Sequence, residues 1–266
     1  MEFLDLSFPT PAENLACDEA LLDWREKDGG DGILRFWESP ETFVVVGYAN
    51  KIAAEVNIAR CESDKIPIFR RCSGGGTVLQ GPGCLNYALI LPIGENSPLS
   101  GISGANKYIM DRNLETIQSI AGKSLDIKVQ GCTDLAAADE IGDWRREGAP
   151  LAGEAPTLPA PVFRKFSGNS QRRHKAFLLF HGTFLLSFNL EAIGKFLIFP
   201  SRQPDYRADR SHGDFLRNLN LPTGAVKDAM KTVWKAPEPL QTPPLSRVHA
   251  LARAKYETRE WNLKFY

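Results

Sequence analysis

The sequence has few of the residues that metal centres and disulfide frameworks need. Its 266 residues include only four histidines and five cysteines, and no two cysteines stand in a CxxC spacing. That spacing is typical of zinc and redox sites, and an odd number of cysteines argues against a complete set of disulfides. We therefore expect no bound metal, reduced thiols and a cytoplasmic location.

Long apolar runs and a net charge are also missing. No apolar segment reaches the roughly 18 residues that a membrane span needs, and residues 1–5 lack the basic start of a signal peptide. Lysine plus arginine equals aspartate plus glutamate at 32 each, so no overall field attracts nucleic acid or an anionic membrane. We expect neither as a partner, and any basic surface must be local.

The hydrophobic content of 43% suffices for one large core, so we predict a single domain over residues 1–266. Hydrophobic periodicity predicts amphipathic helices over 14–27, with Asn14 as N-cap, and over 105–121. Strand-like segments are predicted at 33–37, 42–46 and 125–129, the first two as neighbouring strands.

Three consecutive glycines follow a pair of arginines in the segment 70–78, Arg-Arg-Cys-Ser-Gly-Gly-Gly-Thr-Val. Glycine has no Cβ, so this backbone can approach a ligand closely and present N–H groups to it. Strand-like segments at 65–69 and 85–91 flank the run. The segment is therefore predicted to line a pocket, although glycines also simply mark turns.

A second segment, residues 164–186, carries Lys165, a predicted turn at 167–169 and a basic cluster at 172–175. It ends in an apolar strand with His181-Gly182-Thr183. In order along the chain, these motifs match Arg-Arg-x-Ser-Gly-Gly-Gly, Lys-x-Ser-Gly-x-Ala/Ser and His-Gly-Thr-Leu-Leu. The chain resembles the lipoate-protein ligase A family, which has these three hallmarks.

The resemblance extends from residues 14–22 to residues 255–262 and so covers nearly the whole chain. It implies an α/β (α+β) fold with a mixed, largely antiparallel central sheet flanked by helices, as in the class II synthetase-like catalytic domain of the biotin/lipoate protein ligase superfamily. Residues 137–162, rich in Ala, Pro and Gly, lengthen a connection that is short in the family. We predict a loop insertion there, either a lid or an inessential segment.

The resemblance also implies the reaction. Family members attach a lipoyl or octanoyl group to one lysine of a lipoyl-acceptor domain, of the 2-oxoacid dehydrogenase E2 or glycine cleavage H protein type. The ligase route passes through lipoyl-AMP. Its cofactor is lipoate or lipoyl-AMP, and ATP and Mg are further candidate cofactors. The intact run at 73–76 favours this route, because cysteine-dependent octanoyltransferases often replace one of its glycines.

By resemblance, Lys165 contacts the acyl carbonyl and phosphate oxygens, and the Ser167-Gly168 turn gives room and N–H groups. The alternative for Lys165 is an exposed, salt-bridged hairpin lysine. His181 is not assigned as a base, since a satisfied core histidine fits its apolar strand. The predicted binding residues are Arg70, Arg71, Ser73, Gly74, Gly75, Gly76, Thr77, Val78, Asn86, Ser167, Gly168, His181, Gly182 and Thr183.

Each group in that set has a predicted role. Arg70 and Arg71 suit a phosphate or carboxylate because guanidinium donates in a planar fork. The 73–76 run lines the acyl tunnel and adenylate pocket, and the backbone of Gly182 and Thr183 borders the adenine. Asn86 holds a phosphate or ribose, or serves only in packing.

Two other functions stay open. A transferase would take the acyl group from acyl carrier protein or a lipoyl protein through a thioester on Cys132, which otherwise is a structural thiol. A catalytically silent lipoyl-binding homologue would bind ligand without modifying an acceptor. From the resemblance we expect no accessory domain after residues 260–262, and therefore a separate small accessory chain as a partner. The basic cluster at 172–175 either docks an acidic acceptor domain or is a solvated face.

Overall fold

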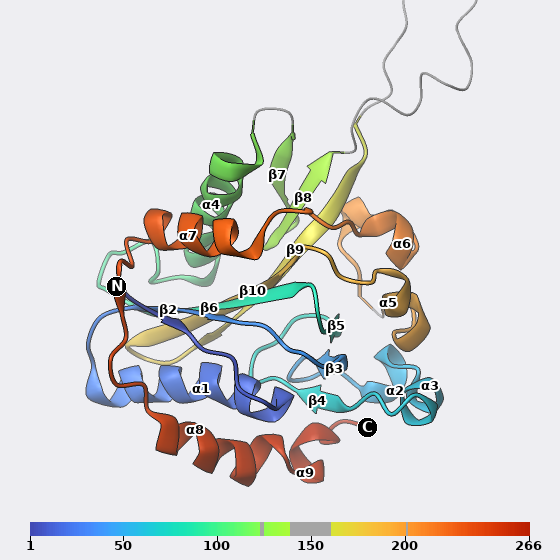
Figure 1. The fold of residues 1–266 in the computed structure, drawn as a ribbon, viewed down its shortest axis with the longest axis horizontal. Helices are drawn as coiled ribbons and strands as arrows, with labels where there is room; N and C mark the ends of the chain where they lie inside the picture. The colour runs from blue at the N-terminus through green and yellow to red at the C-terminus, as the bar shows by residue number, and fades with distance from the viewer. Residues whose placement is uncertain (123–124, 139–160, 201) are drawn as a thin grey trace, which may run out of the picture.

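The computed structural model describes residues 1–122, 125–138, 161–200 and 202–266. Its centre is an eight-stranded sheet with the order β11-β1-β2-β6-β10-β9-β8-β7 (Figure 1). β1 runs parallel to both of its neighbours, and the other pairs in this sheet are antiparallel. The predicted mixed, largely antiparallel sheet is confirmed.

The strands of the large sheet are β1 Glu2–Asp5, β2 Ile33–Trp37, β6 Cys84–Pro92, β7 Ile127–Gln130, β8 Asp134–Ala138, β9 Phe163–Arg173, β10 Phe177–Leu185 and β11 Glu238–Pro239. A smaller sheet has the order β4-β3-β5, with β3 Phe43–Val46, β4 Ile68–Arg70 and β5 Val78–Gln80. The helices are α1 Pro11–Asp28, α2 Ile52–Glu55, α3 Ile58–Ser63, α4 Ile102–Ala121, α5 Glu191–Phe196, α6 His212–Phe215, α7 Thr223–Val233, α8 Leu245–Leu251 and α9 Arg259–Asn262.

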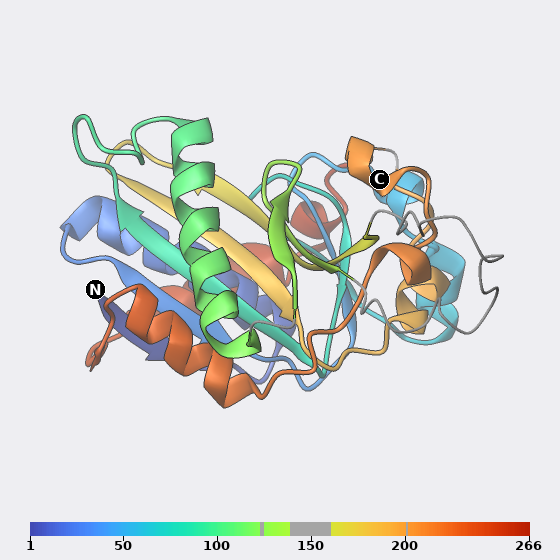
Figure 2. The same cartoon turned by 90° about the horizontal axis from the view of Figure 1, so that it is seen from above.

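Helices cover both faces of the large sheet because alternate strand residues bury apolar side chains on each face. One core cluster joins α4 and α7 to a face of the sheet, and a second joins α1 and α8 to the other. Figure 2 shows α4 and α7 side by side over the first of these faces. The small sheet packs with α2, α3 and α5 around a third cluster.

Three local predictions are wrong. Helix α1 begins at Pro11 with Thr10 as its N-cap, because Thr10 and Glu13 form a reciprocal capping box. Asn14 instead lies buried in the first turns and binds the carbonyl oxygens of Phe8 and Thr10. Strands β2 and β3 are not neighbours: β2 pairs with β1 and β6, whereas β3 pairs with β4 and β5.

The third wrong prediction is the turn at 167–169. These residues lie within the continuous strand β9. Across from it, the register of β8 shifts between Leu135 and Ala136, so the ladder accommodates the segment without a turn. Most of the predicted insertion, residues 139–160, lies outside the described residues. Its first two residues, Ala137 and Ala138, belong to β8.

Candidate active site

A row of residues across five strands forms the floor of a cavity of about 430 Å³. Antiparallel pairing sets Trp37 opposite Asn86 and Asn86 opposite Thr183. The row continues to Gly168 and then to Asp134. Directly opposed residues of antiparallel strands point to the same face, and all five line the cavity. The register thus assembles residues that are up to 146 positions apart in the sequence.

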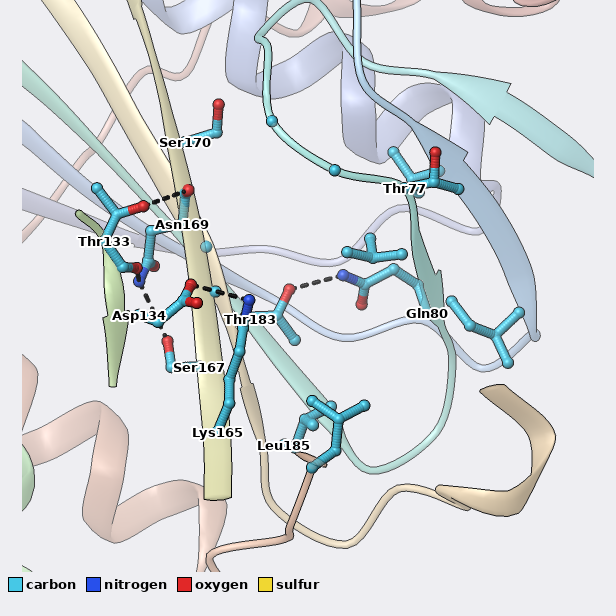
Figure 3. Close-up of a pocket in the computed structure, with 18 of the residues that line it drawn as sticks. Thr77, Gln80, Thr133, Asp134, Lys165, Ser167, Asn169, Ser170, Thr183 and Leu185 are labelled. Carbon is cyan, nitrogen blue, oxygen red and sulfur yellow. Dashed lines mark hydrogen bonds and ion pairs between the residues drawn. The ribbon is translucent and has the colours of Figure 1, made fainter. Parts of the chain in front are cut away.

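Lys165 extends from β9 over one end of this floor (Figure 3). Its Nζ lies 2.8 Å from Oδ1 of Asp134, whose Oδ2 accepts a 2.7 Å hydrogen bond from the Tyr206 hydroxyl. Burial and the nearby Asp134 raise the pKa of Tyr206, so this hydroxyl stays protonated. The ammonium is a fixed positive charge at the cavity, suited to an oxygen that gains negative charge.

Gly168 gives this ammonium its room. A Cβ built at Gly168 would lie 2.7 Å from Lys165 Nζ, which is closer than real contacts allow. With a Cβ at this position the flexible end of Lys165 would have to move, so Gly168 permits the present placement of the ammonium. Ser167 is buried beside it and also lines the cavity.

Gly75 and Gly76 of the glycine loop line the cavity with Arg71, whereas Ser73 and Gly74, predicted to line it, are not part of the lining. Nε of Arg71 donates to the carbonyl oxygen of Gly74 at 3.1 Å, and Nη2 donates to that of Gly76 at 2.7 Å. Gly75 has φ +86°, a conformation that favours glycine. Thr77 and Val78 follow on the cavity wall. Burial lowers the pKa of Arg71 to about 10, which leaves it charged at neutral pH.

Arg70 lies away from the cavity. Its guanidinium Nη1 donates to the carbonyl oxygens of Gly47 and Asn50 at 2.8 and 2.9 Å, and Nε donates to that of Trp261. The side chain is fully buried and is not part of the cavity lining. Arg70 thus joins α9 to the small sheet, and its donors are taken by backbone, contrary to the predicted phosphate or carboxylate contact.

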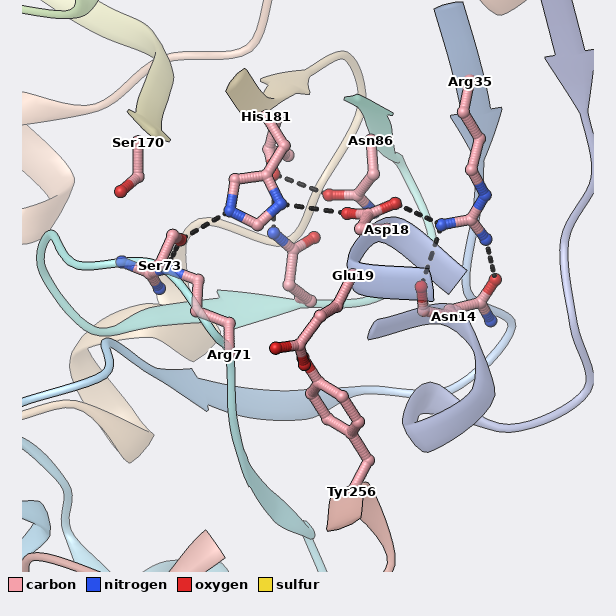
Figure 4. A network of polar contacts seen from close by, with 12 residues as sticks. Asn14, Asp18, Glu19, Arg35, Arg71, Ser73, Asn86, Ser170, His181 and Tyr256 are labelled. Atoms are coloured by element: carbon pink, nitrogen blue, oxygen red, sulfur yellow. Dashed lines mark hydrogen bonds and ion pairs between the residues drawn. The ribbon is translucent and has the colours of Figure 1, made fainter. Parts of the chain in front are cut away.

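His181 joins two elements through both ring nitrogens (Figure 4). Nδ1 lies 2.9 Å from Oδ2 of Asp18, and Nε2 lies 2.6 Å from the Ser73 hydroxyl. Burial raises the pKa of Asp18, but Arg35 and His181 outweigh it and hold that pKa below the ordinary value. Since Arg71 donates to Ser73, the hydroxyl proton of Ser73 is free to point at Nε2. The two contacts orient the imidazole between α1 and the glycine loop.

The Asp18 contact was not predicted from the sequence. The available signal was an acidic residue within the apolar helix segment at 14–22, which indicates a buried partner of opposite charge. Arg35, in the following strand, is that partner.

Gly182 is required by a second buried network on the other face of the strand. A Cβ at Gly182 would collide with the Asn169 side chain, whose Oδ1 accepts a 2.6 Å bond from the Tyr87 hydroxyl. Asn113 of α4 in turn donates to Tyr87. Burial raises the pKa of Tyr87, which keeps it a donor. The glycine of the His-Gly-Thr motif thus permits close strand packing beneath the cavity.

Gln80, Thr183 and Asn86 form a short hydrogen-bonded chain on the cavity wall. Gln80 Nε2 donates to the Thr183 hydroxyl, which donates to Asn86 Oδ1, each at 2.6 Å. The other polar atom of each amide, Gln80 Oε1 and Asn86 Nδ2, has no partner although both side chains are buried.

The cysteines divide into two groups, and all five are in described residues. Cys132 is exposed in the turn between β7 and β8 and lines the cavity with Lys165. The others are buried, and burial raises their pKa to about 11 or 12. This second group is Cys17, Cys61, Cys72 and Cys84.

The mouth of the cavity includes a segment that the sequence reading missed. Arg202 and Arg207 line it from the chain between α5 and α6, and His212 lines it from the start of α6. The Arg207 guanidinium lies between the rings of Phe199 and Phe215, at 4.9 and 4.8 Å from their centroids. Burial and Arg207 lower the pKa of His212, which favours its neutral form.

The basic cluster at 172–175 is largely engaged in structural contacts. Arg172 donates to the carbonyl oxygen of Cys72, and Arg173 donates to that of Leu99. His174 lies 3.7 Å from an Asp23 oxygen. These contacts favour loop support over docking for the two arginines.

Within residues 1–122, 125–138, 161–200 and 202–266, no group of three or more His, Cys, Asp or Glu side chains is placed to hold a metal ion. No helix in these ranges is both long and apolar enough to cross a membrane.

Relatives of known type share both the sequence and the fold. The family model of the lipoyl protein ligase A/B catalytic domain matches residues 10–234. Octanoyltransferase LipM of Geobacillus kaustophilus is 27% identical over 98% of this chain and 97% of its own. LipM of Bacillus subtilis is 24% identical over 98% and 97%.

Solved structures with the same fold include a bi-partite lipoate protein ligase from Thermoplasma acidophilum, described with its E2 lipoyl domain. It has a TM-score of 0.76 at 20% identity and covers 100% of this chain and 96% of its own. A lipoate-protein ligase A bound with ATP has a TM-score of 0.70 at 19% identity, with coverage of 100% and 99%.

The chain therefore belongs to the lipoyl protein ligase A/B catalytic domain family. The family recognised from the three motifs is confirmed, as is its class as a lipoyl or octanoyl transferring enzyme.

Proposed function

We propose that this protein transfers a lipoyl or octanoyl group, through a thioester on Cys132, to a lysine of a lipoyl-acceptor domain. The observation that carries this proposal is the placement of Cys132. It is exposed, two residues before Asp134, on the same cavity as the Lys165 ammonium. The relatives named octanoyltransferase that match this chain nearly end to end give independent support. The transferase, our second sequence prediction, thus becomes the first.

The chemistry divides into two balanced steps. The Cys132 thiolate attacks the carbonyl carbon of a donor thioester, and the donor thiol leaves as the acyl-enzyme thioester forms. The acceptor lysine, as the neutral amine, then attacks this thioester. An amide forms, and the Cys132 sulfur leaves as the thiol after taking one proton from the amine nitrogen. In both steps negative charge develops on the carbonyl oxygen, where the Lys165 ammonium stabilises it.

The ligase route through lipoyl-AMP is the second candidate. The intact glycine loop, with its backbone held by Arg71, supports this candidate. A fold neighbour is described as bound with ATP, and another as bi-partite. On the ligase route, the single catalytic domain at 1–266 would use ATP, with Mg as a candidate cofactor, and would work with a separate accessory chain. For either route we propose E2-type or H-protein-type acceptors.

Intact-mass analysis of a purified lipoyl domain tests both routes. The protein is incubated with the domain and, in separate tubes, octanoyl- or lipoyl-acyl carrier protein, ATP plus lipoate, and lipoyl-adenylate. We expect one acyl group on the domain in the first tube and none with Cys132→Ser. Modification only with ATP or adenylate would support the ligase. Ligand binding without modification in any tube would support a silent homologue.

A further inference from the structure

Tyr206 joins the mouth of the cavity to the pair formed by Asp134 and Lys165. It lies in a short 3-10 turn, Asp205–Arg207, between α5 and α6. Its hydroxyl donates a 2.7 Å hydrogen bond to Oδ2 of Asp134, which lies 72 positions earlier in the sequence. Tyr206 is not among the residues that line the cavity. A contribution of this hydroxyl to the reaction therefore passes through Asp134.

The segment that carries Tyr206 is held against the large sheet. Arg210 donates to the carbonyl oxygens of Tyr206 and Phe163 at 2.9 and 3.0 Å. The Tyr206 ring packs on Phe215, with the ring centroids 5.2 Å apart. The same ring borders Gly131, where an added Cβ would lie 3.6 Å from Cε1 of Tyr206. These contacts present the hydroxyl to Asp134 from a fixed position.

The hydrogen bond from Tyr206 limits how Asp134 can bind the ammonium of Lys165. Of the two carboxylate oxygens, Oδ2 accepts from the hydroxyl, and Oδ1 lies 2.8 Å from Nζ. Among the described residues, Asp134 is the only partner of this Nζ. A lysine has three N–H donors, so the other two can face an oxygen that gains negative charge in the cavity. Without the hydroxyl, Oδ2 would lose its donor and compete for the same ammonium.

We propose that Tyr206 is a positioning residue for acyl transfer, which holds one oxygen of Asp134 and so keeps the Lys165 ammonium directed at the reacting carbonyl oxygen. The inference rests on the proposed acyl transfer and adds to it a residue from outside the cavity. The alternative role for Tyr206 is packing against Phe215 alone. A phenylalanine at position 206 separates the two roles, because it keeps the ring and loses only the donor.

The test is a double-mutant cycle of Tyr206→Phe and Asp134→Asn, measured as the rate of acyl transfer to one lipoyl domain. We expect Tyr206→Phe to lower kcat by about tenfold and to change KM by less than about twofold, because it removes a hydrogen bond to a charged group that does not touch the acceptor. In the Asp134→Asn background the same substitution should lower kcat by less than about twofold, since its effect passes through the carboxylate.

Tyr48→Phe is the matched control. The Tyr48 hydroxyl accepts from Lys264 at the surface, and Tyr48 does not line the cavity. Its kcat should equal that of the wild type, and urea denaturation reports the stability of each variant. A wild-type kcat in Tyr206→Phe, whatever its stability, would leave only the packing role and overturn the inference. Losses in kcat that multiply in the double variant would also overturn it.

Two further measurements separate this inference from the route of transfer. The cycle is repeated with lipoyl-adenylate as the donor, so failure of the thioester route does not end the test. The rate of iodoacetamide alkylation at Cys132 needs no turnover. Because a neighbouring ammonium favours the reactive thiolate, we expect Tyr206→Phe to slow this alkylation at pH 7.5 by about threefold or more, but not in the Asp134→Asn background. If no donor acylates the domain, the proposed function fails, yet this coupled slowing would still support the inference. An unchanged alkylation rate in that case would overturn it.

Discussion

Lys165 is held by groups that would not otherwise meet: Asp134 across the strand pair, and Gly168 beneath its ammonium. Replacing Lys165 by alanine removes the positive charge that faces the carbonyl oxygen. We expect Lys165→Ala to lower the transfer rate by about 10²-fold or more, with the fold retained. Initial rates by intact mass, with circular dichroism for the fold, measure this.

Lys227→Ala is the control, because Lys227 pairs with Asp5 and Glu38 and does not line the cavity. It should keep near wild-type rates. Retained turnover in Lys165→Ala would remove this residue from the mechanism.

The cysteines make a separate prediction about reactivity. The thiolate is the reactive form, and burial raises the pKa of Cys72 and Cys84 to about 12. Iodoacetamide at pH 7.5 should therefore add a single label to the native protein, at Cys132. Peptide mass mapping locates the label. Labelling of Cys132→Ser at the same rate would show that another thiol is the reactive one.

Strands β9 and β10 depend on glycine where they pass closest to buried side chains. In Gly182→Ala the new Cβ collides with the Asn169 side chain. This side chain must then move away from the position in which it accepts a hydrogen bond from the Tyr87 hydroxyl. We expect a loss of about 1–3 kcal/mol in the free energy of unfolding, measured by urea denaturation. Gly224→Ala in α7 is the control: nothing lies within 4 Å of that Cβ, so stability should hold or rise. Equal effects of the two substitutions on stability would contradict the claim that Gly182 permits close packing of β9 against β10.

The same elements show how far the sequence could predict the structure. Periodicity located α4 and β6, because a helical or strand pattern is local information. It failed at Ser167-Gly168, where the glycine signals a close approach by Lys165 that only the folded register reveals. It also failed for β2 and β3, because sheet membership depends on long-range pairing.

For the site, the motifs predicted Lys165, Gly75, Gly76 and Thr183 as cavity residues, and these line the cavity, but Ser73 and Gly74 do not. They could not separate Arg71 from Arg70, since the two are adjacent in sequence and differ only in which backbone groups fold around them. The contact between Asp18 and His181 was missed because the two residues lie 163 positions apart in the sequence.

The stability of the whole molecule should depend on the buried Asp18. Its pKa in the folded protein is below the ordinary value of 3.8, so the unfolded chain takes up the proton first. The stabilisation is complete above about pH 4 and is lost as the pH falls through the folded-state pKa. Asp18→Asn should flatten this acid dependence and cost about 3–5 kcal/mol at pH 7, since Arg35 stays buried without its charged partner.

Urea unfolding at pH 7, 4 and 3 measures the dependence. Asp111→Asn, in an exposed pair with Lys107, should change little at any of these values. An Asp18→Asn profile parallel to that of the wild type would exclude Asp18 as a source of the acid sensitivity.

The central claim is that the acyl group passes through Cys132, and trapping the acyl-enzyme tests it most directly. The protein is mixed with lipoyl-pantetheine thioester without acceptor, quenched in acid and weighed intact. The account predicts a mass increase of one lipoyl group that maps to Cys132, is absent in Cys132→Ser and disappears when a lipoyl domain is added. Transfer to the domain at an undiminished rate by Cys132→Ser, with no adduct on the wild type, would contradict it.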